Sequence, residues 1–142
     1  MKLKDKACIV TGAGSGIGHA IAMRFASEGA KLAIADLNSD AANKAAARIR
    51  ETFGTDAMAI PMDVTSEEQV NAGVQAVVGA WGTVDVLVSN AGIQIVNPVE
   101  HFAYADWKKM LAVHLDGAFL TSRAVLPYMY AQGSGSIIFM GS

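Results

Sequence analysis

The chain of 142 residues is long enough for one domain with its own hydrophobic core. Hydrophobic residues make up 52% of it and charged residues 17%, which excludes an intrinsically disordered chain. The formal net charge of −2 provides no basic footprint, so we expect no nucleic-acid partner. No uninterrupted apolar run reaches the roughly 18 residues of a membrane span, so we expect no membrane partner.

The N-terminus and the cysteine content bear on the cellular compartment. Residues 1–6 are charged like the start of a signal peptide, but the segment after them is broken by glycines and has no leucine-rich centre. Cys8 is the only cysteine, so the chain cannot form an internal disulfide, which fits a reducing compartment. We therefore expect a cytoplasmic protein.

Short apolar runs and amphipathic segments alternate along the chain without a linker. Strands are predicted over residues 7–10, 31–36, 57–62, 84–89 and 136–140. Helices are predicted over 16–28, over 40–51, from the capping box Ser66-Glu67-Glu68-Gln69 onwards, and over a long stretch from 106 to 130. Residues 90–103 are expected to form a loop, and Pro127 is expected to bend or end the last helix.

This alternation predicts an α/β fold of the Rossmann type. Helices of this length between strands imply a parallel sheet with right-handed crossovers and helices on both faces. We expect a doubly wound sheet in three α/β/α layers with the strand order 3-2-1-4-5. Residues 1–142 are interpreted as one dinucleotide-binding domain, incomplete at its C-terminal side.

A glycine-rich turn joins the first predicted strand to the first helix. It runs from Thr11 to Gly18 as Thr-Gly-Ala-Gly-Ser-Gly-Ile-Gly, which is neither the common G-x-G-x-x-G spacing nor a P-loop. The unpaired N–H groups and the dipole of the helix start favour an anion, and glycine lets the backbone approach a pyrophosphate closely. The turn predicts a dinucleotide-binding site, against the alternative of a merely flexible loop. The residues assigned to it are Gly12, Ser15, Gly16, Ile17 and Gly18.

Polar residues follow three further strands, at the sheet edge where open parallel sheets bind ligands. Asp36, with Leu37 beside it, is predicted to accept hydrogen bonds from the adenosine ribose, the alternative being an exposed charge at a strand end. Asp63 and Val64 are assigned to the adenine edge, unless Asp63 only caps a turn or a helix. The segment Asn90-Ala91-Gly92 lets the backbone pass close to a cofactor, although it also suits an ordinary turn.

Together these motifs resemble the short-chain dehydrogenase/reductase family. The similarity runs from the Thr11–Gly18 turn through Asp63 and the segment 90–92 to Gly135-x-Ile137 and Ser142. It implies an enzyme that transfers hydride with a nicotinamide cofactor, and Asp36 favours NAD. In that family a Tyr is the general base, a Lys lowers its pKa, and a Ser orients the reacting oxygen.

The resemblance assigns catalytic roles to two residues of this chain. Ser142 falls at the place of the family's serine, or is simply a polar residue at a strand end. His114 stands where the family usually has the Asn of Asn-x-x-Gly, whose backbone carbonyl supports a proton relay. A histidine keeps that carbonyl, but a helix histidine without a catalytic part is an equal alternative. The family's Tyr-x-x-x-Lys is expected beyond Ser142, so residues 1–142 alone are expected to be inactive.

The substrate is predicted from Gln94 and its surroundings. The run from Gly92 through Trp107 to Phe119 is similar to bacterial D-3-hydroxybutyrate dehydrogenases, and the Gln94 amide would donate to a substrate carboxylate. Gln94 is otherwise an exposed loop residue. The resulting hypothesis is an NAD-dependent enzyme interconverting a short 3-hydroxy acid and its keto form, with Gln94 and Ser142 binding the substrate.

Two other functions and the assembly state remain open at this point. The chain could serve another alcohol or sugar, or it could be a non-catalytic dinucleotide-binding module. Members of the resembled family are usually homotetramers or homodimers, and we expect one of these. His19 and His101 lack partners at metal-ligand spacing, so no metal site is predicted.

Overall fold

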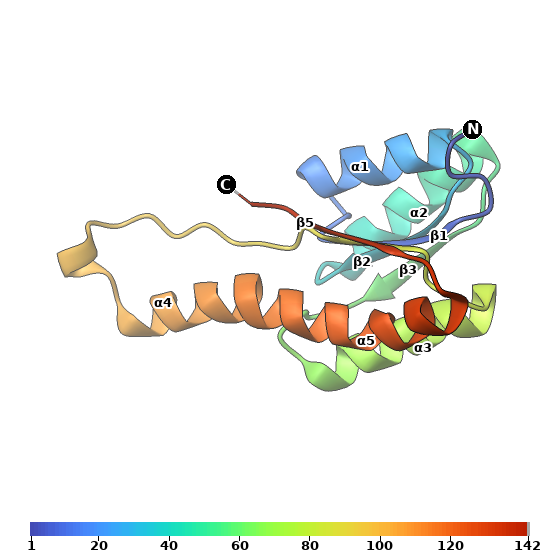
Figure 1. Ribbon diagram of the computed structural model, residues 1–142. Helices are drawn as coiled ribbons and strands as arrows, with labels where there is room; N and C mark the ends of the chain where they lie inside the picture. Colours follow the sequence, from blue (N-terminus) through green and yellow to red (C-terminus); the bar gives the residue numbers. More distant parts are fainter. Residues whose placement is uncertain (142) are drawn as a thin grey trace.

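A single five-stranded parallel sheet organises the protein, whose computed structural model describes residues 1–141 (Figure 1). Its strand order is β3-β2-β1-β4-β5, which confirms the predicted Rossmann-type topology. Each strand was located from the sequence to within two residues at either end. The strands are β1 (Ala7–Thr11), β2 (Lys31–Asp36), β3 (Ala57–Pro61), β4 (Val86–Ser89) and β5 (Ser136–Phe139).

Helices cover both faces of the sheet and complete the three layers. Figure 1 shows α1 (Gly16–Ser27) and α2 (Ser39–Phe53) on one face, with α3 (Glu67–Trp81) and α5 (Gly117–Gln132) on the other. Alternate residues of each central strand enter different cores, as the period of two of a strand requires. Thus Cys8 and Val10 pack under α1 and α2, whereas Ile9 packs under α3 and α5.

The start of α3 corrects part of the predicted capping box. The Ser66 hydroxyl accepts a hydrogen bond from the Gln69 N–H at 3.2 Å, as expected of an N-cap. The Gln69 side chain does not return to the Ser66 N–H, because that group already donates to the Asp63 carbonyl. Instead the Gln69 amide oxygen accepts from the Asp63 N–H at 2.8 Å, so α3 is tied to the end of β3.

The long predicted helix is one rod built from three segments. It begins with α4 (Tyr104–Leu111), continues through a π-helical turn, η2 (Ala112–Asp116), and ends with α5. Pro127 lies inside α5, so of the two expected effects, bending or ending the helix, the second is wrong. Proline removes one backbone donor, but the neighbouring Val125 and Met129 are buried against the sheet and hold the helix in place.

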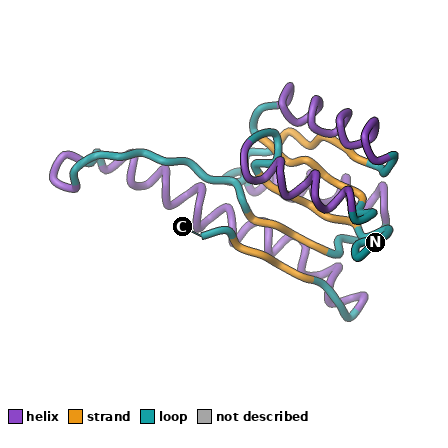
Figure 2. The backbone as a smooth tube through the Cα atoms, turned by 90° about the horizontal axis from the view of Figure 1, so that it is seen from above, coloured by secondary structure: helices purple, strands orange, loops and turns teal. Residues whose placement is uncertain are grey.

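The loop after β4 extends away from the sheet and returns into α4. Figure 2 shows this segment and the start of the rod projecting together as an arm beside the sheet. The arm contains a short 3₁₀ helix, η1 (Val99–His101), within what was expected to be irregular loop. In the described residues 1–141, no helix has both the length and the apolar character that crossing a bilayer requires.

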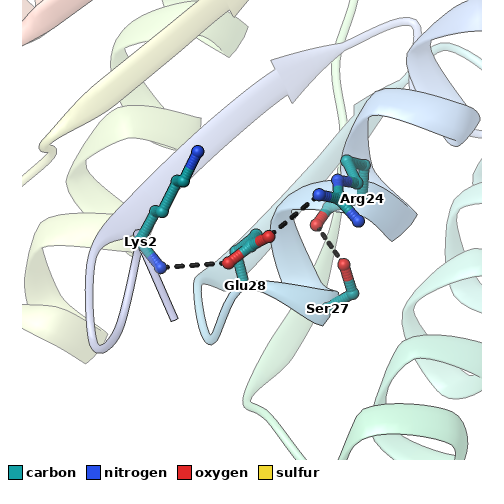
Figure 3. Close-up of polar contacts among 4 residues, drawn as sticks. All are labelled: Lys2, Arg24, Ser27 and Glu28. Atoms are coloured by element: carbon teal, nitrogen blue, oxygen red, sulfur yellow. Dashed lines mark hydrogen bonds and ion pairs between the residues drawn. The ribbon is translucent and has the colours of Figure 1, made fainter.

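The N-terminal residues are tied to the end of α1 (Figure 3). Glu28 accepts a hydrogen bond from the Lys2 backbone N–H and pairs with Arg24, each at 3.0 Å. The Lys2 N–H, more than the Arg24 charge, lowers the pKa of the Glu28 carboxyl. The Leu3 N–H adds a bond to the Glu28 carbonyl. These contacts orient the chain into β1.

Candidate functional site

A hollow of about 410 Å³ opens at the carboxyl ends of the strands. It spans the point between β1 and β4 where the strand order reverses, which is where doubly wound sheets bind their ligands. We call it the switch-point hollow. Its lining residues are Gly12, Ser15, Ile17, Asp36, Leu37, Met62, Asp63, Val64, Asn90, Ala91, Gly92, Ile93 and Val113.

The hydroxyl of Thr11 joins the two halves of this hollow. Thr11 Oγ1 accepts hydrogen bonds from the N–H groups of Asn90 and Ala91, both at 3.0 Å. The Asn90 side chain returns the link, donating to the Thr11 carbonyl at 3.1 Å. Thr11 is almost fully buried, so these bonds are shielded from water. They hold the glycine turn and the segment 90–92 against each other.

The glycine turn needs glycine because other groups approach it closely. Gly12 has a φ of +67°, and a Cβ there would lie 3.0 Å from the Ala91 Cα. A Cβ on Gly14 would lie 2.8 Å from an Asp36 carboxylate oxygen. Any larger residue at these positions would push the turn away from β4 or from Asp36. The turn is therefore shaped by its neighbours as well as by its own flexibility.

Asp36 is fixed by backbone donors and still has acceptor capacity. One carboxylate oxygen accepts from the Gly14 N–H and the other from the Asn38 N–H, each at 2.8 Å. A carboxylate has about four lone-pair positions, so each oxygen keeps one for a further donor. These free acceptor positions suit the hydroxyl groups of a ribose, which would donate to them. The hydrogen bonds from Gly14 and Asn38 also give Asp36 a structural role that the sequence did not reveal.

Asp63 takes part in a local turn as well as lining the hollow. Its Oδ1 accepts from the Thr65 N–H at 2.9 Å and from the Thr65 hydroxyl at 2.6 Å. The alternative of a turn-forming aspartate is therefore present in the structure, and the second oxygen is left for other donors.

Most of the residues assigned to dinucleotide binding do meet in the hollow; Gly16 and Gly18 do not line it. Gly16 instead has a φ of +60° with open space around it, and Gly18 is buried. Met62, Ile93 and Val113 line the hollow without having been predicted. Each adjoins a residue predicted for the site, namely Asp63, Gly92 and His114 respectively.

Two of the three residues assigned to catalysis and substrate binding, Gln94 and His114, lie at the border of the hollow. Gln94 is exposed in the arm, directly after the lining residue Ile93. The His114 Nε2 lies 2.8 Å from the Ile93 carbonyl oxygen and 3.3 Å from the Ile93 nitrogen, so it donates to the carbonyl in one tautomer and accepts from the N–H in the other. A Cβ on Gly92 would lie 2.6 Å from the imidazole, so this contact depends on glycine. The prediction for Ser142 falls outside the described residues.

The chemistry of the lining is that of a binding site for an organic ligand. Among residues 1–141, no group of three or more His, Cys, Asp or Glu side chains is placed to hold a metal ion. The hollow has the volume of small-molecule sites, with two carboxylates and a helix N-terminus as polar features. A nucleotide supplies the hydroxyl donors and the phosphate that these features bind.

An anion-binding glycine turn at the switch point of a doubly wound sheet is typical of dinucleotide-binding proteins. Comparison with known families assigns the chain more narrowly. Residues 6–142 match the short chain dehydrogenase family, and the chain belongs to that family.

The names of its characterised relatives refer to several different compounds. The chain is 41% identical over 140 residues to an uncharacterized oxidoreductase of Bacillus subtilis, covering 99% of this chain and 54% of that protein. It is 38% identical to D-threitol dehydrogenase of Mycolicibacterium smegmatis (99% and 54% covered) and 37% identical to levodione reductase of Leifsonia aquatica (96% and 52% covered). None of these three is named for 3-hydroxybutyrate.

A solved structure agrees closely with this one. NAD+-bound xylitol dehydrogenase superposes with a TM-score of 0.96 and 40% sequence identity, covering all of this chain and 55% of that one. The chain thus spans about half the length of the proteins it matches.

Proposed function

We propose that this chain is the cofactor-binding part of an NAD-dependent oxidoreductase that interconverts a secondary alcohol and its ketone. The observation that carries the proposal is the switch-point hollow, where the glycine turn, Asp36, Asp63 and the segment 90–92 converge. Membership of the short chain dehydrogenase family and the NAD+-bound neighbour support it.

Each part of the hollow has a role in this proposal. The free N–H groups at the start of α1 bind the pyrophosphate, with Gly12, Gly16 and Gly18 allowing its close approach. Asp36 accepts from the adenosine ribose, and Asp63 contacts the adenine edge. When bound, the nicotinamide accepts or donates a hydride. Ser142 orients the substrate oxygen, and the His114 backbone carbonyl supports proton transfer.

The proposal includes a preference for NAD over NADP, because Asp36 would face the 2′-phosphate. Unit charges about 4 Å apart repel by about 4 kcal/mol at an effective dielectric of 20. No Lys or Arg stands at positions 15, 37 or 38 to offset this. We expect a preference of roughly a hundredfold or more, since about 1.4 kcal/mol is a factor of ten.

The test is titration of the full-length protein with both cofactors, in wild type and in Asp36→Ala. The wild type should prefer NAD, and the variant should lose most of that preference. Because Asp36 also holds the Gly14 N–H, unfolding of the cofactor-free variant is measured in parallel. Equal affinity for the two cofactors in the wild type contradicts the assignment.

For the substrate we propose a short 3-hydroxy acid, with D-3-hydroxybutyrate as the best candidate. The support is Gln94, which follows the lining residue Ile93 and whose amide can donate to a carboxylate. In the complete enzyme, Gln94→Ala should weaken acid substrates by about 1–3 kcal/mol, the cost of an unmade bond to a charged group. A neutral alcohol should be affected much less. Equal losses of kcat/KM for both substrates would refute this role.

A polyol is the second candidate substrate, favoured by the relatives named for threitol and xylitol. Measuring kcat/KM for D-3-hydroxybutyrate, D-threitol and xylitol in the same preparation distinguishes the two candidate substrate classes. A preference for the polyols removes the 3-hydroxy acid but leaves the dehydrogenase proposal standing.

Catalysis in this proposal also needs a Tyr-x-x-x-Lys beyond Ser142. If the full-length protein binds NAD and has no such motif, the proposal changes to a non-catalytic dinucleotide-binding module. We further propose that the full-length protein is a cytoplasmic homotetramer or homodimer. Light scattering of the full-length protein tests this assembly state.

A further inference from the structure

Two glycines lie behind the apolar wall of the switch-point hollow without lining it. The wall includes Met62 and Val64, two buried residues that follow β3. Gly73 of α3 lies against Met62, and Gly117, the first residue of α5, lies against Val64. Both glycines are buried in helices and neither has a positive φ, so no turn explains them. What each provides is room for the wall residue in front of it.

Val64 is the wall residue that can adapt least. A Cβ on Gly117 would lie 2.7 Å from the Val64 Cγ2 and 3.1 Å from the Val64 Cβ. Because valine branches at Cβ, it has few χ1 rotamers, and no rotation about χ1 moves the Cβ away. A Cβ on Gly73 would instead meet the terminal methyl of Met62, which is the end of a flexible side chain. A side chain at position 117 therefore forces either Val64 or α5 to move.

The helix α5 is held by its packing and resists a shift away from Val64. Its continuous buried face is made of Gly117, Thr121, Val125 and Met129. Moving the helix outward would loosen all of these contacts at once, because protein interiors are closely packed. Val64, by contrast, borders the hollow, where no protein atoms oppose a movement. The wall is therefore the part that yields, and it yields into the hollow.

The turn that carries Val64 directs this movement to its side chain. The backbone of the neighbouring Asp63 is fixed, because its N–H donates to the Gln69 amide oxygen and its carbonyl accepts from the Ser66 N–H. A displaced Val64 side chain would narrow the part of the hollow next to Asp63, which the proposed function assigns to adenine. A planar base binds an apolar wall by van der Waals contact, and a small advance of the wall replaces that contact with overlap.

We propose that Gly117 is a positioning residue for the cofactor, which keeps Val64 withdrawn and the adenine side of the hollow open because it has no side chain. The inference rests on the proposed function, since it takes adenine to occupy that side. Gly117 acts through Val64 and does not itself line the hollow. Ligands that contain adenine should therefore depend on Gly117, whereas a ligand with only the nicotinamide nucleotide should not.

The experiment is calorimetric titration of the full-length protein with NAD, 5′-AMP and nicotinamide mononucleotide. The test variant is Gly117→Ala. The matched control is Gly79→Ala, which makes the same change at an exposed position of α3 where a Cβ would have nothing within 4 Å. Gly117→Ala is also made in the Val64→Ala background, which removes the methyl groups nearest to the new Cβ. Thermal unfolding verifies that each variant folds.

In Gly117→Ala we expect NAD and 5′-AMP to bind about five- to twentyfold more weakly, as overpacking strain of the usual size implies when it falls on the bound state. Nicotinamide mononucleotide should stay within about twofold, as should all three ligands in Gly79→Ala. In the Val64→Ala background, Gly117→Ala should weaken NAD by less than about twofold. Equal weakening of all three ligands, or equal weakening of NAD in both backgrounds, would indicate a general loosening of the fold and overturn the proposal.

A Gly117→Ala variant that does not fold is replaced by a pair of variants. Gly117→Ala and Gly117→Val are then compared in the Val64→Ala background, where only the larger side chain reaches the wall again. Weaker binding of 5′-AMP to the Gly117→Val variant upholds the proposal, and equal binding overturns it. A wild type that binds neither NAD nor 5′-AMP would refute the proposed function and this inference with it. Binding to the wild type that is unchanged in Gly117→Ala would refute this inference alone.

Discussion

Thr11 is the single residue on which the geometry of the switch-point hollow most depends. Replacing it with Val keeps the shape but leaves the N–H groups of Asn90 and Ala91 without an acceptor. Each unsatisfied buried donor costs about 1–3 kcal/mol, so we expect Thr11→Val to lose about 2 kcal/mol or more of unfolding free energy. Urea denaturation of the full-length protein measures this.

Thr11→Ser is the matched control for that change. Serine keeps the hydroxyl and loses only a methyl group, which we expect to cost less than about 1.5 kcal/mol. If the two variants lose the same stability, the hydroxyl is not what holds the turn to the segment 90–92.

Cys8 provides a pH-dependent prediction at the same scale. Burial, with a smaller contribution from the Asp85 carboxylate, raises the pKa of the Cys8 thiol from 9.0 to about 12. The Cys8 thiol therefore stays protonated to a higher pH in the folded state than in the unfolded state. This contribution to stability is complete below pH 9.0 and is lost as the pH rises towards 12.

Alkylation measures the consequence directly. At about pH 8 the native thiol should not react with iodoacetamide, whereas the urea-unfolded chain should react at the rate of an ordinary cysteine. Rapid labelling of the native protein would show that Cys8 is not protected by burial.

At the scale of elements, the end of α5 is linked to the sheet through one side chain. The Gln132 amide donates to the Val84 carbonyl, the Asp85 carboxylate and the Ser134 carbonyl, at distances from 3.0 to 3.3 Å. Its oxygen accepts from the Thr83 hydroxyl at 3.0 Å. Gln132 thus connects α5 with the entries to β4 and β5.

We expect Gln132→Ala to lower the unfolding free energy by about 1 kcal/mol, because only its bond to the Val84 carbonyl is partly buried and such a bond contributes about 1 kcal/mol. The control is Gln75→Ala, on the exposed face of α3, where alanine should cost nothing. The two variants are compared by their denaturation midpoints, with the slope of the unfolding free energy against denaturant concentration unchanged. A loss in both variants would point to a general effect of removing glutamine.

At the scale of the whole molecule, β5 is an edge strand with exposed apolar residues. Ile138 is 41% exposed and Phe139 60% exposed, and Met140 after them is 42% exposed. An exposed apolar edge is a template for pairing with another chain. We therefore expect residues 1–142, expressed alone, to be inactive and to aggregate.

The variant Phe139→Lys should reduce that aggregation, because a charge on an edge strand opposes pairing. Trp107→Lys is the matched control, since Trp107 is 53% exposed on α4 and lies outside the sheet. Light scattering at equal concentration compares them. A stable monomer of residues 1–142 with cooperative unfolding would contradict the prediction, as would an equal improvement from both variants.

Local signals in the sequence determined the order of strands and helices, the parallel sheet and most of the binding residues. Period-two and helical patterns, with glycines and caps between them, act over a few residues and can be read without a structure. Polar residues directly after the strands, such as Asp36 and Asn90, also follow from this pattern, because the carboxyl ends of parallel strands share one edge.

Only the tertiary structure decided which of these groups touch. Thr11 and Asn90 are 79 residues apart, and only the register of β1 against β4 brings them within a hydrogen bond. Gln69 binds Asp63 rather than completing its capping box, and Pro127 continues a helix that it was expected to bend or end. In each case a contact formed by packing, which depends on distant parts of the chain, outweighed the local preference.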